Sequence, residues 1–138
     1  MNKVELIGRL TKNPTIRYSK SEPVQTIALF VLAVNRTYRQ EGSQNTDFIY
    51  CCAVGKRAEF IEKYFVRGLR VSIVGHIQSN SYISDDGTMI YRTEVFVEEA
   101  ESMEKLRGTA GMQTDPEASV SYPEEMGTQT SYWKDYDL

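Results

Sequence analysis

The residue types needed for catalysis or metal binding do not occur in a suitable pattern. His76 is the only histidine in the sequence. Cys51 and Cys52 are adjacent, so on a strand their side chains point to opposite faces and cannot hold one metal ion. Asp85-Asp86 is a pair of ordinary turn formers. We therefore expect no enzyme activity, no metal and no cofactor, and we expect both cysteines to be reduced, buried thiols.

Aromatic and basic side chains are interleaved through the middle of the chain. On a strand at 47–54, alternation places Phe48 and Tyr50 on one face, together with Cys52 and Val54. The opposite face holds small apolar side chains suited to a barrel interior, namely Ile49, Cys51 and Ala53. The aromatic candidates for a binding surface are Tyr38, Phe48, Tyr50 and Tyr82. The basic candidates are Arg36, Arg39, Lys56, Arg57 and Arg92.

These two sets of side chains predict a surface for single-stranded nucleic acid. Each base can stack on an aromatic ring, and each phosphate can be neutralised by Lys or Arg. Stacking contributes about 1–3 kcal/mol per base, so three or four aromatic rings outweigh a modest positive charge. The alternative interpretation is that the aromatics pack the ends of the domain and the charges are simply solvated.

The elements that must position these residues are mostly strands. Apolar periodicity and turn residues predict strands at 4–10, 25–34, 47–54, 69–79 and 88–97, the first of which resumes at 15–19. Helical spacing predicts one helix at 56–66, ended by Arg67-Gly68. Residues 98–105 fit either an extension of the last strand or a short helix. The order indicates an all-β fold with one helix, the OB-fold, which is a five-stranded Greek-key barrel with its helix between strands three and four.

Segment 25–34 is apolar almost without alternation, which indicates burial on both of its faces. One face would line the barrel, and we expect a partner subunit to cover the other.

Charge divides the chain into two parts. Residues 1–97 carry 13 Lys and Arg against 9 Asp and Glu, a net +4, whereas residues 98–138 carry 3 against 10, a net −7. Within 108–138, 14 of 31 residues are Gly, Ser, Thr, Pro or Gln, a composition that buries too little apolar surface to offset its ordering entropy. We therefore expect a folded domain at 1–106 and a disordered acidic tail at 107–138.

Motifs in the same order along residues 1–106 resemble bacterial single-stranded DNA-binding proteins. They include Met1-Asn2-Lys3-Val4, Leu32-Ala33-Val34-Asn35-Arg36, Thr46-Asp47-Phe48-Ile49 and Tyr91-Arg92-Thr93-Glu94-Val95. The resemblance implies an OB-fold that assembles as a homotetramer and wraps single-stranded DNA without sequence preference. It also implies roles in DNA replication, recombination and repair. No apolar run approaches the roughly 18 residues of a membrane span, so we expect a cytoplasmic, nucleoid-associated protein.

The sequence departs from this family in two places. The family's stacking positions fall on Tyr38, Phe48, Val54 and Tyr82, and Val54 replaces the usual Trp or Phe. Tyr50 lies two residues away on the same face and is the expected substitute. The chain ends in Asp135, Tyr136, Asp137 and Leu138 without the Ile-Pro-Phe ending usual in the family. These four residues are our candidates for recruiting replication and repair proteins, and the alternative is a merely solubilising tail.

Two other classes of function stay open beside single-stranded DNA binding. An OB-fold interaction module, such as a primosome-type accessory protein, would mainly contact other proteins, and both departures favour it. An enzyme acting on nucleic acid would need a catalytic constellation that we do not find. A specialised copy carried by a phage or mobile element would account for both departures.

Overall fold

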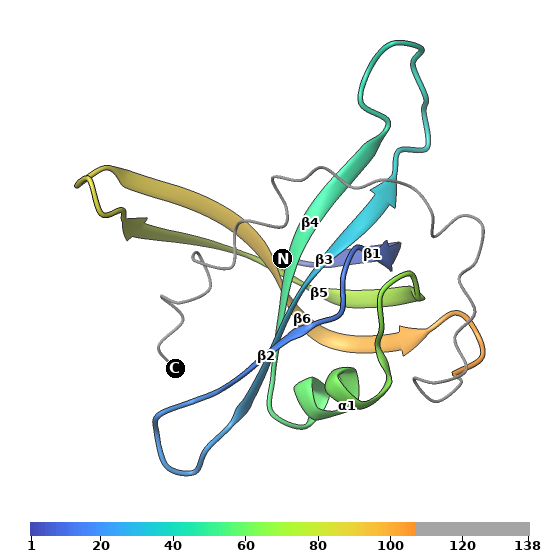
Figure 1. The fold of residues 1–138 in the computed structure, drawn as a ribbon. Coiled ribbons are helices and arrows are strands. Elements are labelled where there is room, and N and C mark those ends of the chain that lie inside the picture. Colours follow the sequence, from blue (N-terminus) through green and yellow to red (C-terminus); the bar gives the residue numbers. More distant parts are fainter. Residues whose placement is uncertain (107–138) are drawn as a thin grey trace.

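Six strands and one helix form the described part of the chain, residues 1–106 of a computed structural model. The strands are β1 (Val4–Leu10), β2 (Thr15–Tyr18), β3 (Thr26–Asn35), β4 (Thr46–Val54), β5 (Arg70–Ile83) and β6 (Met89–Ser102). The helix α1 (Lys56–Tyr64) lies between β4 and β5 (Figure 1).

The sheet closes into a barrel. Its strand order is β1-β5-β6-β4-β3-β2, and a further pairing of β1 with β3 joins the two ends of the series. All neighbours are antiparallel except β4 and β6, which run parallel where Cys51 and Cys52 meet Val95 and Phe96. This arrangement confirms the predicted OB-fold.

The first two strands lie along the same edge of β3 and together act as one interrupted strand. β1 pairs with β3 at Ala33 and Leu32, and β2 pairs with it from Leu29 to Thr26. The six observed strands therefore correspond to the five that the sequence predicts.

Gly8 permits the close crossing of β1 and β3. A Cβ atom at this position would stand 2.6 Å from the carbonyl oxygen of Ala33, closer than real Cβ contacts allow. The barrel can close here only because residue 8 has no side chain.

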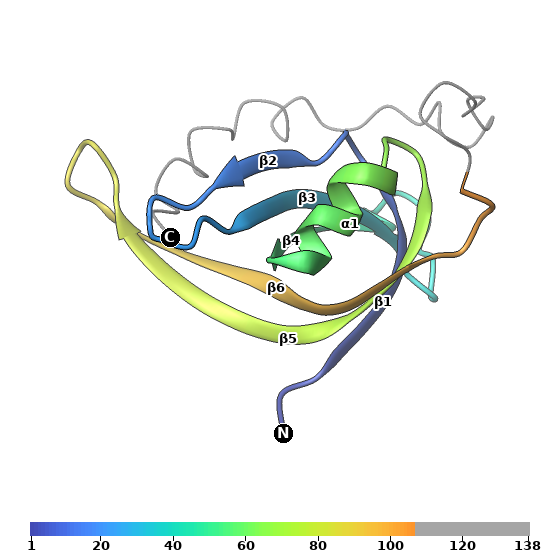
Figure 2. The same cartoon turned by 90° about the horizontal axis from the view of Figure 1, so that it is seen from below.

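The barrel interior is filled by the inward-facing side chains of every strand and by α1. Ile49, Cys51 and Ala53 of β4 belong to this core, as the alternation predicts. Ala58 and Ile61 of α1 are fully buried against it, so the helix covers one end of the barrel (Figure 2).

The helix is shorter than the sequence predicts. It ends at Tyr64, because Phe65 leaves the helical conformation to insert its ring into the core, 6.3 Å from the ring of Phe30. Gly68 is therefore not the helix cap. It adopts a positive φ of 85° in the following turn, where its amide donates to the carbonyl of Leu10.

The β5–β6 hairpin is longer than predicted and extends beyond the barrel as a curved ribbon (Figure 2). Residues 98–102 continue β6, which settles the open alternative in favour of strand. The Asp85-Asp86-Gly87 turn joins Ile83 to Met89 as predicted. On one side of this ribbon, apolar side chains stay exposed: Ile77, Ile83, Met89 and Tyr91.

Candidate nucleic-acid interface

The outer face of β4 carries a second, smaller apolar cluster. Ile27 and Leu29 of β3 are buried there with Cys52 of β4. Tyr50, Val54 and Tyr82 are partly buried and pack against these three side chains. Tyr82 reaches the cluster from β5, so the structure brings together two of the aromatic candidates and the unusual Val54.

Part of the second apolar face of β3 is covered within the chain itself. We expected a partner subunit to cover the second apolar face of β3. In the structure, Ile27 is 1% exposed and Leu29 is 2% exposed within a single chain. Cys52, Tyr50 and Val54 of β4 and Tyr82 of β5 pack against them. Val31 and Ala33, on the same face of β3, stay partly exposed, so coverage of that part by a partner subunit remains a prediction.

Both cysteines are free and buried, as predicted, one on each face of β4. Burial raises the pKa of both thiols, that of Cys52 to about 12, and the neighbouring Glu94 adds to each shift. Both are therefore protonated at neutral pH and act as apolar packing groups.

Arg92 lies over the ring of Tyr50, with its guanidinium carbon 4.9 Å from the ring centroid. A cation above an aromatic face is an attractive arrangement. It places a positive charge and an aromatic ring, the two groups that a nucleotide requires, at one point of the outer face.

Glu94 is a carboxyl group buried in the same face. It is 2% exposed, and its Oε1 atom accepts a hydrogen bond of 2.6 Å from the amide of Asn80. Within residues 1–106, its Oε2 atom has no hydrogen-bond partner and almost no solvent contact. Burial raises the pKa of Glu94 to about 7, although the hydrogen bond from Asn80 and the charge of Arg92 act against that shift.

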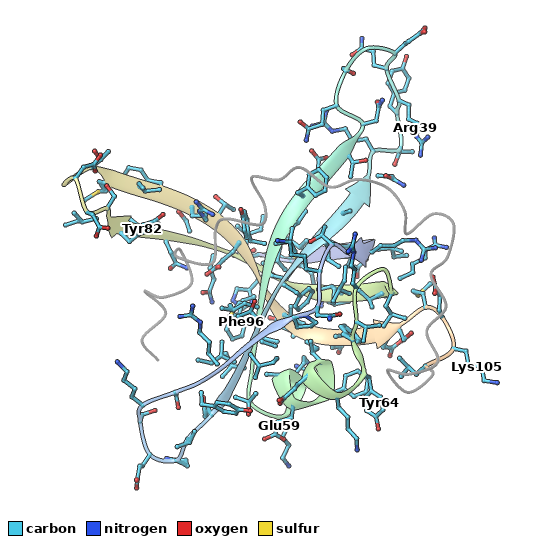
Figure 3. The ribbon with its side chains drawn as sticks, viewed as in Figure 1. Arg39, Glu59, Tyr64, Tyr82, Phe96 and Lys105 are labelled. Carbon is cyan, nitrogen blue, oxygen red and sulfur yellow. The ribbon has the colours of Figure 1, made fainter. Side chains whose placement is uncertain are left out.

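The loop between β3 and β4 projects from the barrel and carries Tyr38 and Arg39 (Figure 3). Tyr38 is 85% exposed, so its ring is available for stacking. Figure 3 shows Arg39 on this loop, at a distance from Tyr82 on the β5–β6 hairpin. The structure therefore does not bring these two candidates together, and the length of β4 separates them.

Arg36 is held by an ion pair at the base of this loop. Its Nε and Nη2 atoms donate to the two carboxylate oxygens of Asp47, at 2.9 and 2.7 Å, and Nη1 donates to the carbonyl of Gln44. The hydrogen bonds from Arg36 lower the pKa of Asp47, so the pair stays ionised at neutral pH. Arg36 thus joins the two sides of the loop, a contact that the sequence did not predict.

The remaining candidates lie along and beside β4. Phe48 pairs with Ala33 and shares the outward face with Tyr50 by alternation. Lys56 and Arg57 are exposed in the first turn of α1, directly beyond Val54 and Gly55. β4 therefore runs from the projecting loop, past Phe48 and Tyr50, to a basic helix start, and nine residues of strand span roughly 26 Å.

Sequence reasoning missed two residues of the outer face, Glu94 and Phe96. Phe96, labelled in Figure 3, is the ladder partner of Cys52. Its ring lies 5.3 Å from that of His76. The signal was present in the sequence, since Val95 and Val97 face the core and alternation turns their neighbours outward.

The four terminal candidates, Asp135, Tyr136, Asp137 and Leu138, lie outside the described residues, as does the tail predicted at 107–138. Within residues 1–106, no group of three or more side chains has the composition and spacing of a metal site. In the same part of the chain, no helix has the length and apolar character of a membrane span.

A closed OB barrel with aromatic and basic side chains on one outer face defines a nucleic-acid-binding class of protein. Residues 1–103 match the single-strand binding protein family, and the chain belongs to that family.

Similar proteins of known name agree with this assignment. A single-stranded DNA-binding protein of Clostridium perfringens is 35% identical over 144 residues, covering 100% of this chain and 93% of the relative. Single-stranded DNA-binding protein 3 of Clostridium acetobutylicum is 42% identical over 104 residues, covering 75% and 72%. Single-stranded DNA-binding protein 2 of the same organism is 43% identical over 104 residues, covering 75% and 77%.

Proposed function

We propose that this chain binds single-stranded DNA without sequence preference, along the outer face of β4, and protects it during replication, recombination and repair. The observation that carries the proposal is the outer face itself. Arg92 lies over Tyr50 there, and Tyr82 packs on the same apolar cluster, in a chain of the single-strand binding family.

Bases would stack on Tyr38, Phe48, Tyr50 and Tyr82, and phosphates would pair with Arg39, Lys56, Arg57 and Arg92. We assign Arg36 a different part, because Asp47 holds its guanidinium at the base of the loop. Its contribution to binding is then to fix the loop that presents Tyr38 and Arg39.

Fluorescence anisotropy of a labelled oligo-dT tests the stacking assignment. Replacing both Phe48 and Tyr82 with Ala should weaken binding by about 30-fold or more, since each stacked base contributes roughly 1–3 kcal/mol. Tyr18→Ala is the matched control. Tyr18 is 61% exposed, but it follows Ile16 on the face of β2 turned away from the outer cluster. Unchanged affinity in the double variant would refute the assignment.

A second candidate function is an interaction module that mainly contacts proteins. The small side chain of Val54, in place of an aromatic ring, is the observation that favours it. Anisotropy of single-stranded against duplex oligonucleotides separates the two functions. A strong preference for the single strand supports DNA binding, and equal, weak binding supports the interaction module.

We also propose that the chain forms a homotetramer. Exposed apolar side chains on β1 and on the β5–β6 ribbon support assembly, among them Ile7, Ile77 and Tyr91. Light scattering coupled to size exclusion measures the mass directly, and a monomeric mass at micromolar concentration would refute the proposal.

The domain assignment is part of the same proposal, with a DNA-binding domain at 1–106 and a tail at 107–138. We propose that Asp135, Tyr136, Asp137 and Leu138 recruit replication and repair proteins. Pull-downs with and without residues 128–138 test this, and the partners should be lost on truncation while DNA affinity is retained. We further propose that the protein is non-catalytic, acts without a cofactor and works in the cytoplasm on the nucleoid.

A further inference from the structure

Glu94 lies at the centre of the proposed DNA-binding face rather than at its margin. The parallel ladder pairs Cys51 with Val95 and Cys52 with Phe96, so Glu94 is the neighbour of Tyr50 on β6. Arg92, one step along the same face, extends over the ring of Tyr50. The buried carboxyl group is therefore next to a cation and an aromatic ring that we assign to one nucleotide.

The groups around this carboxyl group determine how strongly its charge affects the outer face. On β6, the charged neighbour is Arg92. On β4, the neighbours that titrate are the thiols of Cys51 and Cys52, both protonated at neutral pH, and the phenol of Tyr50. On β5, Asn80 and Gln78 carry amides, and His76 lies further along, bonded to Gln78 and Glu98.

We propose that protonation of Glu94 controls the affinity of this face for single-stranded DNA, with tighter binding when the carboxyl group is neutral. The proposal rests on the assignment of the outer face as the DNA-binding surface. A protonated Glu94 adds no charge to the face. A deprotonated Glu94 places a negative charge beneath the nucleotide path, where it repels phosphates and competes with them for Arg92.

Thermodynamic linkage between proton binding and DNA binding fixes the direction of the pH effect. The fully buried position and the partnerless Oε2 atom disfavour the carboxylate, and burial brings the pKa of Glu94 to about 7. A bound phosphate beside Arg92 disfavours the carboxylate further, so DNA binding takes up a proton near neutrality. Affinity must then fall as the pH rises through 7.

Anisotropy of labelled oligo-dT at constant ionic strength from pH 6 to pH 8.5 tests the proposal, because thymine does not titrate in this range. The affinity of the unaltered protein should fall on the order of fivefold, the effect of one charge roughly 8 Å from a phosphate in a partly solvated site. Glu94→Gln should bind with the high affinity at every pH. Glu94→Asp keeps the carboxyl group and should keep a pH dependence with a displaced midpoint.

His76→Gln is the matched control, because it replaces an imidazole on the same face with a neutral amide. This variant should retain the full pH dependence. A pH-independent affinity of the unaltered protein, or an equal slope in Glu94→Gln, would overturn the inference while leaving the proposed function intact. Absence of binding to oligo-dT at every pH would overturn both.

Discussion

At position 54 the outer face carries a valine that packs on Ile27, Leu29 and Cys52 and offers no stacking surface. We expect Val54→Phe to raise oligo-dT affinity about tenfold, because one additional stacked base contributes roughly 1–3 kcal/mol. Anisotropy at fixed salt measures the change. The new ring would stand beside Tyr82 and directly before Gly55 and Lys56.

The control is Val24→Phe, which adds the same ring at an exposed site between β2 and β3. Its affinity should not change. If both variants gain equally, the gain comes from general apolar character and not from the position of residue 54.

Single-residue predictions from the sequence were accurate where strand alternation determined them. Alternation alone assigned Cys51 and Ala53 to the interior and Tyr50 to the outer face. It could not assign the partner of Arg36, because the contact with Asp47 depends on the path of the intervening loop. Nor could it reveal the burial of Glu94, which depends on side chains of neighbouring strands such as Asn80 of β5.

At the scale of elements, the loop between β3 and β4 depends on the Arg36–Asp47 pair. We expect Asp47→Asn to weaken oligo-dT binding several-fold, because the loop that carries Tyr38 and Arg39 loses its anchor. Charge alone predicts the opposite result, since removal of an acid from a DNA-binding protein should strengthen binding. Anisotropy of Asp47→Asn, Arg36→Gln and the double variant measures the coupling between the two residues.

If the Arg36–Asp47 pair holds the loop in place, the two single variants lose similar affinity and the double variant loses little more. Thermal unfolding should change little, because the pair is exposed to solvent. An increase in affinity for Asp47→Asn would show that the pair does not position the loop.

The crossing of β1 and β3 depends on the absence of a side chain at Gly8. We expect Gly8→Ala to lower the free energy of unfolding by about 2 kcal/mol, because its methyl group would meet the carbonyl of Ala33. Urea denaturation measures the change. Thr93→Ala, at an exposed position of β6, is the control and should stay within about 0.5 kcal/mol.

The number and order of the helices and strands could be predicted from the sequence, but their end residues could be predicted less accurately. The helix loses its last predicted residues because Phe65 packs into the core, a tertiary contact that periodicity does not report. Strands β5 and β6 run past the barrel because each satisfies the backbone of the other, and 14-residue strands are longer than their apolar pattern alone suggests.

At the scale of the whole molecule, the basic part of the chain carries only a small net positive charge. With Arg39, Lys56, Arg57 and Arg92 as phosphate contacts, the logarithm of the binding constant should fall with the logarithm of salt concentration with a slope of about −3 per protomer. Anisotropy from low to moderate salt gives this slope. A slope near zero would contradict the assignment of these side chains to phosphates, and Arg92→Gln should reduce the slope by about one contact.

Glu94 also links the stability of the whole domain to pH. Its pKa is about 7 in the folded chain and near the ordinary 4.5 when the chain unfolds. Between these two values the folded state holds a proton that the unfolded state has lost, so stability falls as the pH rises from about 4.5 to 7 and stays lower above.

Glu94→Gln removes this contribution. Relative to the unaltered protein, the variant should therefore gain stability at pH 8 compared with pH 5, on the order of 2 kcal/mol, because each unit of the shift corresponds to about 1.4 kcal/mol and most of the shift lies between these two pH values. Urea denaturation of both proteins at the two pH values measures the difference. An equal difference at pH 5 and pH 8 would show that the buried carboxyl group does not titrate in this range.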